Sequence, residues 1–166
     1  VLVRALQVLE RAASSRGESR IEKWCHEELN RERQRITKAV DFLVPICSAL
    51  EAAGSRTCII KSLDHWPDLG SDLDLYTSGH PATVCSVMES KFQAKLDDRS
   101  WGDRLANKFN FSVPGLPALI QLHVQFLRQT GEHQALRPRV SERRVLRELA
   151  GRTFRVPAPE RRRVLS

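Results

Sequence analysis

Residues 60–76 hold the side chains best suited to chemistry, because Asp72, Leu73, Asp74 and Leu75 alternate acid and leucine there. Successive side chains of a β-strand point to opposite faces, so Asp72 and Asp74 share one face and the leucines pack behind it. Two such carboxylates repel each other, and a hard divalent cation such as Mg²⁺, bound through oxygen ligands, relieves that repulsion. The pattern therefore predicts that Asp72 and Asp74 together bind divalent metal. The alternative is an edge strand whose acids face solvent.

The residues before this strand resemble a known signature. Ile60-Lys61-Ser62 is followed by nine residues and then by the two acids. This spacing resembles the nucleotidyltransferase fold of the DNA polymerase beta superfamily, although Lys61 stands where that family usually has glycine. The Lys61 variant, together with Trp66-Pro67-Asp68, Gly70-Ser71, residues 101–104 and residues 130–133, resembles the uncharacterised bacterial nucleotidyltransferases. The resemblance covers roughly residues 37–159.

The resemblance implies a metal-dependent transfer of a nucleotidyl group from a nucleoside triphosphate to an unknown acceptor. Asp72 and Asp74 would bind Mg²⁺ or Mn²⁺. Ser62 would contact a phosphate, and Lys61 would supply positive charge there or else cover apolar surface as a structural lysine. Gly70 and Ser71 would let the backbone turn into the metal strand.

The family's third acid lies on a neighbouring strand, for which residues 118–127 are the candidate. Gln121 occupies the expected position, and a glutamine cannot take up a proton at neutral pH. His123, on the same polar face, is a candidate replacement base, and Glu132 is a second one. The alternative function is a catalytically impaired nucleotide- or RNA-binding module of the same fold, and Gln121 favours it. A purely structural or interaction domain is a third class.

Three further residues bear on the site. Arg104 and Lys108 are predicted to alternate on a strand near it and to contact the triphosphate. Trp101 is predicted either to lie in the core, as large apolar side chains usually do, or to stack on a base.

The distribution of charge along the chain indicates which kind of binding partner the protein could have. Residues 51–100 carry 5 Lys and Arg against 8 Asp and Glu, whereas residues 101–166 carry 13 against 5. An acidic middle followed by a basic end suits a site where a metal meets a polyanion, so nucleic acid is a candidate partner of the basic C-terminal third. The alternative is a charged surface that only aids solubility.

Hydrophobic periodicity predicts an α/β (α+β) fold, in which a short mixed sheet is flanked by helices. Helices are expected at residues 2–13, 21–30, 37–53 and 81–90, with residues 31–35 as a charged hinge or helix surface. In the helix at 37–53, Val40, Leu43, Cys47 and Leu50 form an apolar stripe, and Gly54 lies where a helix-ending glycine is expected. Strands are expected at residues 57–60, 72–76, 92–96, 108–113 and 118–127, and residues 144–156 form a hairpin or begin as a helix. We predict an N-terminal helical extension (1–36), a nucleotidyltransferase-like domain (37–159) and the start of a truncated C-terminal helix (160–166).

No apolar run approaches the roughly 20 residues that span a bilayer, so no membrane association is expected. The N-terminus does not have the pattern of a signal peptide. The four cysteines form no Cys-x-x-Cys motif and are expected to be reduced thiols, which predicts a cytoplasmic protein.

Overall fold

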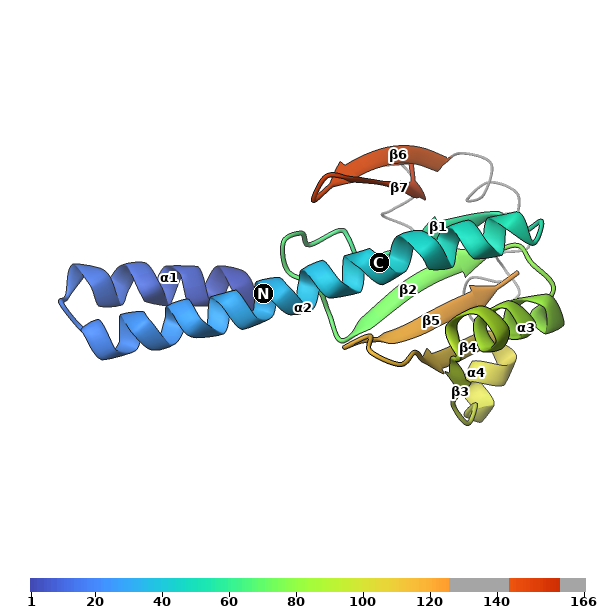
Figure 1. Ribbon diagram of the computed structural model, residues 1–166, viewed down its shortest axis with the longest axis horizontal. Coiled ribbons are helices and arrows are strands. Elements are labelled where there is room, and N and C mark those ends of the chain that lie inside the picture. The colour runs from blue at the N-terminus through green and yellow to red at the C-terminus, as the bar shows by residue number, and fades with distance from the viewer. Residues whose placement is uncertain (126–143, 159–166) are drawn as a thin grey trace.

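The computed structural model describes residues 1–125 and 144–158 (Figure 1). The helices of this part are α1 (Leu2–Ser15), α2 (Ser19–Ala52), α3 (Pro81–Phe92) and α4 (Trp101–Leu105). Its strands are β1 (Thr57–Ile59), β2 (Asp72–Thr77), β3 (Lys95–Leu96), β4 (Lys108–Ser112), β5 (Leu119–Val124), β6 (Arg144–Leu149) and β7 (Arg152–Pro157). The mixed α+β class predicted from the sequence is confirmed.

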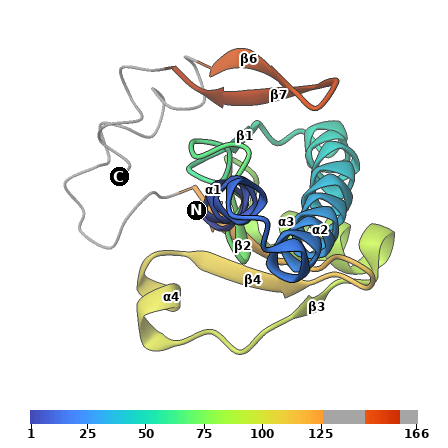
Figure 2. The same cartoon turned by 90° about the vertical axis from the view of Figure 1, so that its left-hand side faces the viewer.

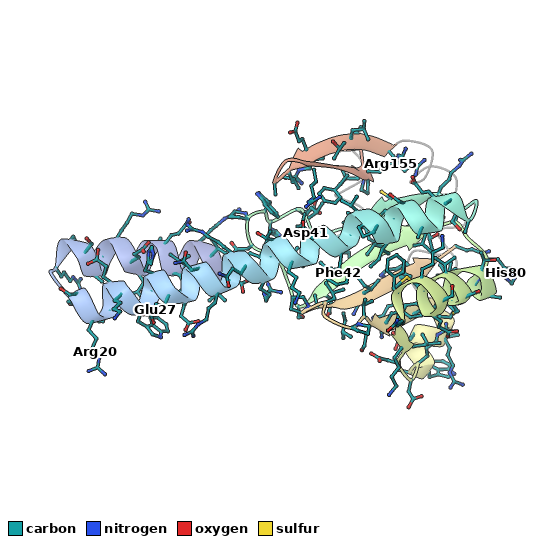
Figure 3. The ribbon with its side chains drawn as sticks, in the orientation of Figure 1. Arg20, Glu27, Asp41, Phe42, His80 and Arg155 are labelled. Carbon is teal, nitrogen blue, oxygen red and sulfur yellow. The ribbon has the colours of Figure 1, made fainter. Side chains whose placement is uncertain are left out.

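Helices α1 and α2 form an antiparallel hairpin that projects from the sheet (Figures 1 and 2). Leu6 of α1 and Leu29 of α2 are buried in the same apolar cluster, while charged side chains such as Arg20 and Glu27 lie on the outside of the hairpin (Figure 3). Helix α2 continues without a break through residues 31–35, which are therefore helix surface and not a hinge. The domain boundary at residue 36 stays a prediction, and it falls inside this helix.

The second half of α2 covers one face of the sheet. Leu43 and Leu50 of the predicted stripe are fully buried there, and so is Ile46, which lies beside the stripe. The helix ends where Gly54 adopts a φ of +82°. Glycine accepts this left-handed conformation without a steric penalty, so Gly54 is the C-terminal stop that the sequence indicated.

The main sheet has five strands in the order β1-β2-β5-β4-β3. Strand β2 pairs antiparallel with β1 and parallel with β5, and the remaining pairs are antiparallel. The parallel register places Asp72 opposite Leu119 and Asp74 opposite Gln121. The chain thus returns to the strand that bears the two acids after it has passed through α3, β3, α4 and β4.

The two faces of this sheet differ in burial. Leu73 and Leu75 of β2 and Ile120 and Leu122 of β5 have no exposed surface; they join the core formed with α2 and α3. Most of the side chains that alternate with them are only half-buried, although Tyr76 at the far end of β2 is buried. We call this second side, which carries Asp72, Asp74, Asn110, Gln121 and His123, the open face.

Some elements differ from the expectation. Helix α3 extends through Phe92, which leaves a strand of only two residues at Lys95–Leu96 where five were expected. Strand β5 ends at Val124, because Gln125 turns into the left-handed region with a φ of +63°. The last two residues expected in that strand lie outside the described part of the chain.

The C-terminal segment forms the hairpin β6–β7, so the strand interpretation is correct and the helical one is wrong. Phe154 and Val156 of β7 are buried in the main core. No helix in the described residues combines the length and the apolar character that crossing a membrane requires. The C-terminal helix predicted at residues 160–166 lies outside the described residues.

Candidate active site

The structure brings the four predicted catalytic residues together on the open face. Asp72 and Asp74 of β2 lie beside Gln121 and His123 of β5. The Gln121 amide donates a hydrogen bond from Nε2 to Asp72 Oδ2 at 3.1 Å. His123 Nε2 lies 3.4 Å from Asp74 Oδ1. Each carboxylate thus has one neighbour from the adjacent parallel strand, and the roles of the four side chains stay predictions.

The two carboxylates have the chemistry of a divalent cation site. Among the described residues, no lysine or arginine forms an ion pair with Asp72 or Asp74. Neighbouring carboxylates without a basic counter-ion repel each other, and a hard cation bound by oxygen removes that repulsion. The same part of the chain holds no cluster of three His, Cys, Asp or Glu able to bind a metal. Two carboxylates are nevertheless compatible with Mg²⁺, which commonly binds through one or two carboxylates and completes its shell with water and substrate phosphates.

The place of a third acid is taken by neutral or weakly basic groups. Gln121 is the register partner of Asp74, and its amide nitrogen faces the Asp72 carboxylate. One ring nitrogen of His123 is directed at Asp74, and the other, Nδ1, is buried without a hydrogen-bond partner in the described residues. Glu132, the other predicted base, lies outside the residues that the structure describes.

The loop before β2 starts with an unusual backbone conformation. Lys61, at the family's glycine position, has a φ of +62°. Glycine reaches this left-handed region easily, whereas most other residues adopt it at an energetic cost. Lys61 therefore holds a backbone conformation that glycine adopts readily, with a lysine side chain in place of a hydrogen.

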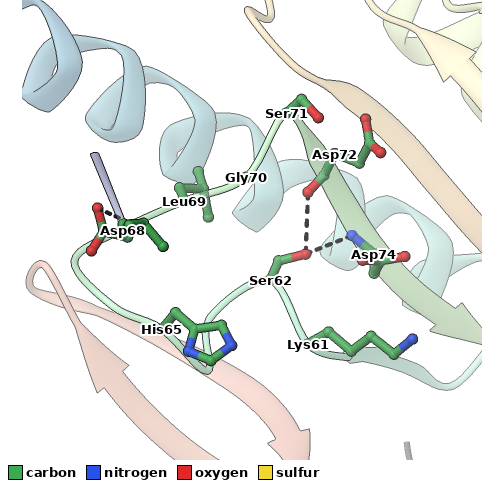
Figure 4. Close-up of a pocket in the computed structure, with 10 residues that line it drawn as sticks. Lys61, Ser62, His65, Asp68, Leu69, Gly70, Ser71, Asp72 and Asp74 are labelled. Carbon is green, nitrogen blue, oxygen red and sulfur yellow. Dashed lines mark hydrogen bonds and ion pairs between the residues drawn. The ribbon is translucent and has the colours of Figure 1, made fainter. Parts of the chain in front are cut away.

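Ser62 connects this loop to the strand that bears the acids. Its hydroxyl oxygen accepts a hydrogen bond from the Asp74 backbone N–H at 2.6 Å, and it lies 3.4 Å from the Asp72 carbonyl oxygen, to which it donates (Figure 4). The side chain is nearly buried. Ser62 thus holds the loop against β2, and its predicted contact with a phosphate stays a prediction.

Arg35 of α2 holds the end of the same loop. Its guanidinium donates to the carbonyl oxygens of Leu69 at 2.6 Å and Gly70 at 3.1 Å. It also donates two hydrogen bonds, of 2.7 and 2.8 Å, to the buried carboxylate of Glu32. These bonds to Glu32 raise the pKa of Arg35 above its ordinary value, against the opposing effect of burial. Four of the five N–H donors of the Arg35 guanidinium are thus used, two on Glu32 and two on the loop.

Helix α1 holds the middle of the loop. The Asp68 carboxylate accepts a hydrogen bond of 2.7 Å from the backbone N–H of Val3, in the first turn of α1. Arg4 donates to the carbonyl oxygens of His65 and Trp66, at 3.3 and 2.8 Å. An acid at a helix N-terminus pairs with N–H groups that have no partner within the helix. The N-terminal helices are therefore bonded directly to the loop that lines the site.

A cavity of about 340 Å³ lies between this loop and β2 (Figure 4). The predicted nucleotide-binding residues Lys61, Ser62, Gly70 and Ser71 all line it. The other lining residues are Val1, His65, Asp68, Leu69, Asp72 and Asp74. We call it the loop cavity. Its volume lies at the lower end of the range typical of small-ligand sites.

Two predicted triphosphate contacts are placed differently. Arg104 is not on a strand, because Ser100 and Asp103 form a capping box that begins α4. Lys108 is on β4, opposite His123, but its ammonium forms an ion pair of 3.3 Å with Asp103. Neither residue lines the loop cavity.

Trp101 does not lie in the core, because 78% of its surface is exposed. It is the first residue of α4, a helix of a single turn and a half in which no residue is buried. The core interpretation of this tryptophan is therefore wrong, and the stacking interpretation stays a prediction.

Two arginines near the site, Arg35 and Arg147, were not predicted from the sequence. Arg147 of β6 donates a hydrogen bond of 2.9 Å to the carbonyl oxygen of Leu63, so a third arginine holds the loop. For Arg35, the sequence offered one clue: Glu32 lies three residues before it on a helix, a spacing at which the two side chains can pair. Nothing in the spacing indicated that either arginine reaches a loop so distant in the sequence.

The arginines of the basic C-terminal hairpin are engaged within the molecule. Arg152 pairs with Asp41, and Arg155 with Glu51, both on α2; Figure 3 labels Arg155 and Asp41. Arg144 lies 3.2 Å from the same Glu51 carboxylate. The charge that suggested a nucleic-acid surface is therefore largely compensated in the described part of this segment.

The comparisons with known proteins concern the fold. No protein-family model matches the sequence, and no curated protein matches it. Among solved structures, the chain is similar to the antibiotic-resistance factor ANT(2'')-Ia, with a TM-score of 0.51 and 12% sequence identity, over 74% of this chain and 66% of that one. A tRNA-processing enzyme in an apo form gives a TM-score of 0.43 and 7% identity, over 69% of this chain and 31% of that one. The first similarity shows that this chain shares its fold with the antibiotic-resistance factor.

Proposed function

We propose that this protein is a metal-dependent nucleotidyltransferase that moves a nucleotidyl group from a nucleoside triphosphate to an acceptor. The observation that carries the proposal is the position of Asp72 and Asp74. They line the loop cavity together with Lys61 and Ser62, and no lysine or arginine of the described residues neutralises them. The nucleotidyltransferase-like fold supports the same activity.

Each residue of the cavity has a distinct part in this proposal. Asp72 and Asp74 would hold Mg²⁺ or Mn²⁺, which when bound would neutralise charge on the triphosphate and the leaving pyrophosphate. Lys61 supplies positive charge at the wall of the cavity, and Ser62 fixes the distance between the loop and β2. Catalysis would then consist mainly of positioning and of charge neutralisation, with few proton transfers by the protein.

Thermal unfolding with each of the four nucleoside triphosphates, with and without Mg²⁺, tests the proposal. A ligand that binds only the folded state raises the melting temperature by mass action. We expect a rise that requires both a triphosphate and Mg²⁺. Asp74→Asn should abolish that rise and leave the unliganded protein equally stable or slightly more stable, because one of two repelling charges is removed.

Asp98→Asn is the matched control, since Asp98 is exposed and lies outside the loop cavity. It should bind triphosphate as the wild type does. If Asp72→Asn and Asp74→Asn both keep the Mg²⁺-dependent rise, the assignment of the metal site is wrong.

The contacts that Gln121 and His123 make with the two acids favour a second candidate function. The hydrogen bond from Gln121 to Asp72 and the contact of His123 with Asp74 favour a nucleotide-binding module with impaired catalysis. Both carboxylates then have a partner from β5 in the absence of metal. This alternative predicts triphosphate binding without transfer to any acceptor.

A further inference from the structure

A second cavity meets the loop cavity at Ser71 and Asp72. Its volume is also about 340 Å³. Its lining consists of Ser71, Asp72, Ser112, Val113, Leu116, Pro117, Ala118 and Leu119. We call it the turn cavity, because most of its wall comes from the turn between β4 and β5. Of the lining residues, only Ser71 and Asp72 belong to both cavities.

Strand pairing explains why the two cavities lie on either side of Asp72. Asp72 is the register partner of Leu119, so both side chains project from the open face. Ser112 follows Phe111, the buried partner of Ile120, and it therefore projects from the open face as well. The loop cavity lies on the side of β2 toward β1, and the turn cavity lies on the side toward β4.

The two cavities differ in chemistry. The loop cavity has in its wall the Lys61 ammonium, a cation that can pair with a phosphate, and the His65 ring. Among the described residues, no lysine, arginine or histidine lines the turn cavity, whose single charged group is the Asp72 carboxylate. A phosphate bound there would meet a carboxylate and no cation of the protein. The serine hydroxyls and the apolar side chains suit an uncharged ligand with polar and apolar parts.

We propose that the turn cavity binds the acceptor, and that the acceptor is a small compound without phosphate groups that carries a hydroxyl on a partly apolar skeleton. The inference rests on the proposed function. The acceptor oxygen forms a bond to the α-phosphorus, and the bond from that phosphorus to the oxygen bridging to the β-phosphate breaks. Pyrophosphate leaves with that oxygen and its electron pair, and the hydroxyl proton passes to water.

The charges elsewhere also favour a small acceptor over a nucleic acid. A nucleic acid is bound chiefly by lysines and arginines that contact its phosphates. Arg144, Arg152 and Arg155 of the basic hairpin form ion pairs with acids of α2, and Lys108 on the open face pairs with Asp103. Beside the turn cavity, the exposed Lys95 is the register partner of Ser112 and takes part in none of the ion pairs of the described residues. This lysine alone does not form the row of lysines and arginines that contacts the phosphates of a nucleic acid.

The experiment uses the full chain, Mg²⁺, and nucleoside triphosphates labelled at the α-phosphate. The two acceptor pools are total RNA and a cell extract from which macromolecules and anions have been removed. Ser112→Trp places a large side chain in the turn cavity from an exposed position at the end of β4. Ser90→Trp is the matched control, on an exposed serine of α3 that lines neither cavity.

We expect the wild type and Ser90→Trp to label a compound of the small-molecule pool. Ser112→Trp should lower that transfer by about a hundredfold, the loss typical of a displaced reactant, with an unchanged Mg²⁺-dependent rise in melting temperature. Label in RNA, no labelled small compound despite triphosphate binding, or full transfer by Ser112→Trp would each overturn the inference. Failure of the wild type to bind a triphosphate with Mg²⁺ would instead refute the proposed function itself.

Discussion

The guanidinium of Arg35 lies 2.6 Å from the carbonyl oxygen of Leu69, 34 residues further along the chain. This hydrogen bond joins the long helix α2 to the loop that enters β2, the strand that bears Asp72 and Asp74. The same arginine is paired with the buried Glu32, which fixes the direction of its donors. The position of the loop cavity therefore depends on a helix that contributes no residue to the cavity wall.

Replacing Arg35 should destabilise the fold and weaken ligand binding together. Arg35→Ala removes four hydrogen bonds and leaves the Glu32 carboxylate buried without its partner, so we expect a loss of about 2–3 kcal/mol in the free energy of unfolding. Arg35→Lys should be intermediate, because lysine keeps the charge but not the planar donor fork. Urea unfolding measures the stability, and thermal shifts with Mg²⁺ and triphosphate measure the binding.

Arg33→Ala is the control for this series, since Arg33 is exposed on the same helix. Its effect should stay within about 0.5 kcal/mol. Equal stability of Arg35→Ala and Arg33→Ala would mean that the Arg35 bonds do not hold the loop.

Lys61 allows the backbone and the charge to be tested separately. Its φ of +62° is strained for lysine and relaxed for glycine. Lys61→Gly should therefore keep the stability of the wild type or raise it by up to about 1 kcal/mol, whereas the β-branched Lys61→Val should lower it by about 1–2 kcal/mol. Both variants should bind triphosphate more weakly if the ammonium contacts it. A glycine variant less stable than the valine variant would contradict the backbone argument.

Gln121→Glu should make the thermal stability of the fold depend on divalent cations. The new carboxylate takes the place of an amide that lies 3.1 Å from Asp72, so the two acids repel each other when no cation is bound. We expect the melting temperature to fall by about 2–4 °C without divalent cations, which corresponds to about 1 kcal/mol in a chain of this size, and to recover with Mg²⁺. Differential scanning calorimetry with and without Mg²⁺ measures this effect.

Transfer assays on Gln121→Glu, Gln121→Ala and His123→Ala then separate the two candidate functions. A gain in Gln121→Glu over an inactive parent indicates an impaired enzyme, whereas an active parent disabled by His123→Ala makes His123 the base. Gln34→Glu, on an exposed position of α2, is the control for the added charge. If none of the site variants changes cation binding or transfer, the open face of β5 does not form the site.

Glu51 should make the attachment of the β6–β7 hairpin sensitive to acid. Burial alone would raise the pKa of Glu51, but hydrogen bonds from Thr57 and Arg155 outweigh it and lower the pKa below its ordinary value. A carboxyl whose pKa is lower in the folded state stabilises the fold above its unfolded pKa of about 4.3, and that contribution is lost as the pH falls through the folded value. Glu51→Gln should cost about 1–3 kcal/mol at pH 7, and the difference from the wild type should shrink below about pH 4.

Chemical denaturation across this pH range checks the expectation for Glu51. Glu148→Gln, an exposed position on β6, is the control and should show no such convergence. A constant difference between Glu51→Gln and the wild type from pH 7 to pH 3 would show that the Glu51 charge does not hold the hairpin.

The sequence by itself determined what depends on neighbours along the chain. The alternation of acids and leucines at residues 72–75 predicted both the strand β2 and the shared face of Asp72 and Asp74. The apolar stripe of residues 40–50 and Gly54 predicted the second half of α2 and its end. Alternation in β5 likewise placed Gln121 and His123 on the side that meets the two acids, because side-chain direction in a strand has a fixed period of two.

Only the tertiary structure decided what depends on contacts between distant segments. The serine hydroxyl at position 62 looked free for a phosphate, and folding brings it to the backbone of β2. Nothing near Arg35 or Arg147 in the sequence indicates that these side chains bond to the loop, and nothing near Asp68 indicates that this loop residue bonds to α1. Long-range hydrogen bonds leave no periodic pattern in a sequence. The turn cavity exists because parallel pairing of β2 with β5 carries the β4–β5 turn to Asp72, and that pairing depends on the fold of the whole sheet.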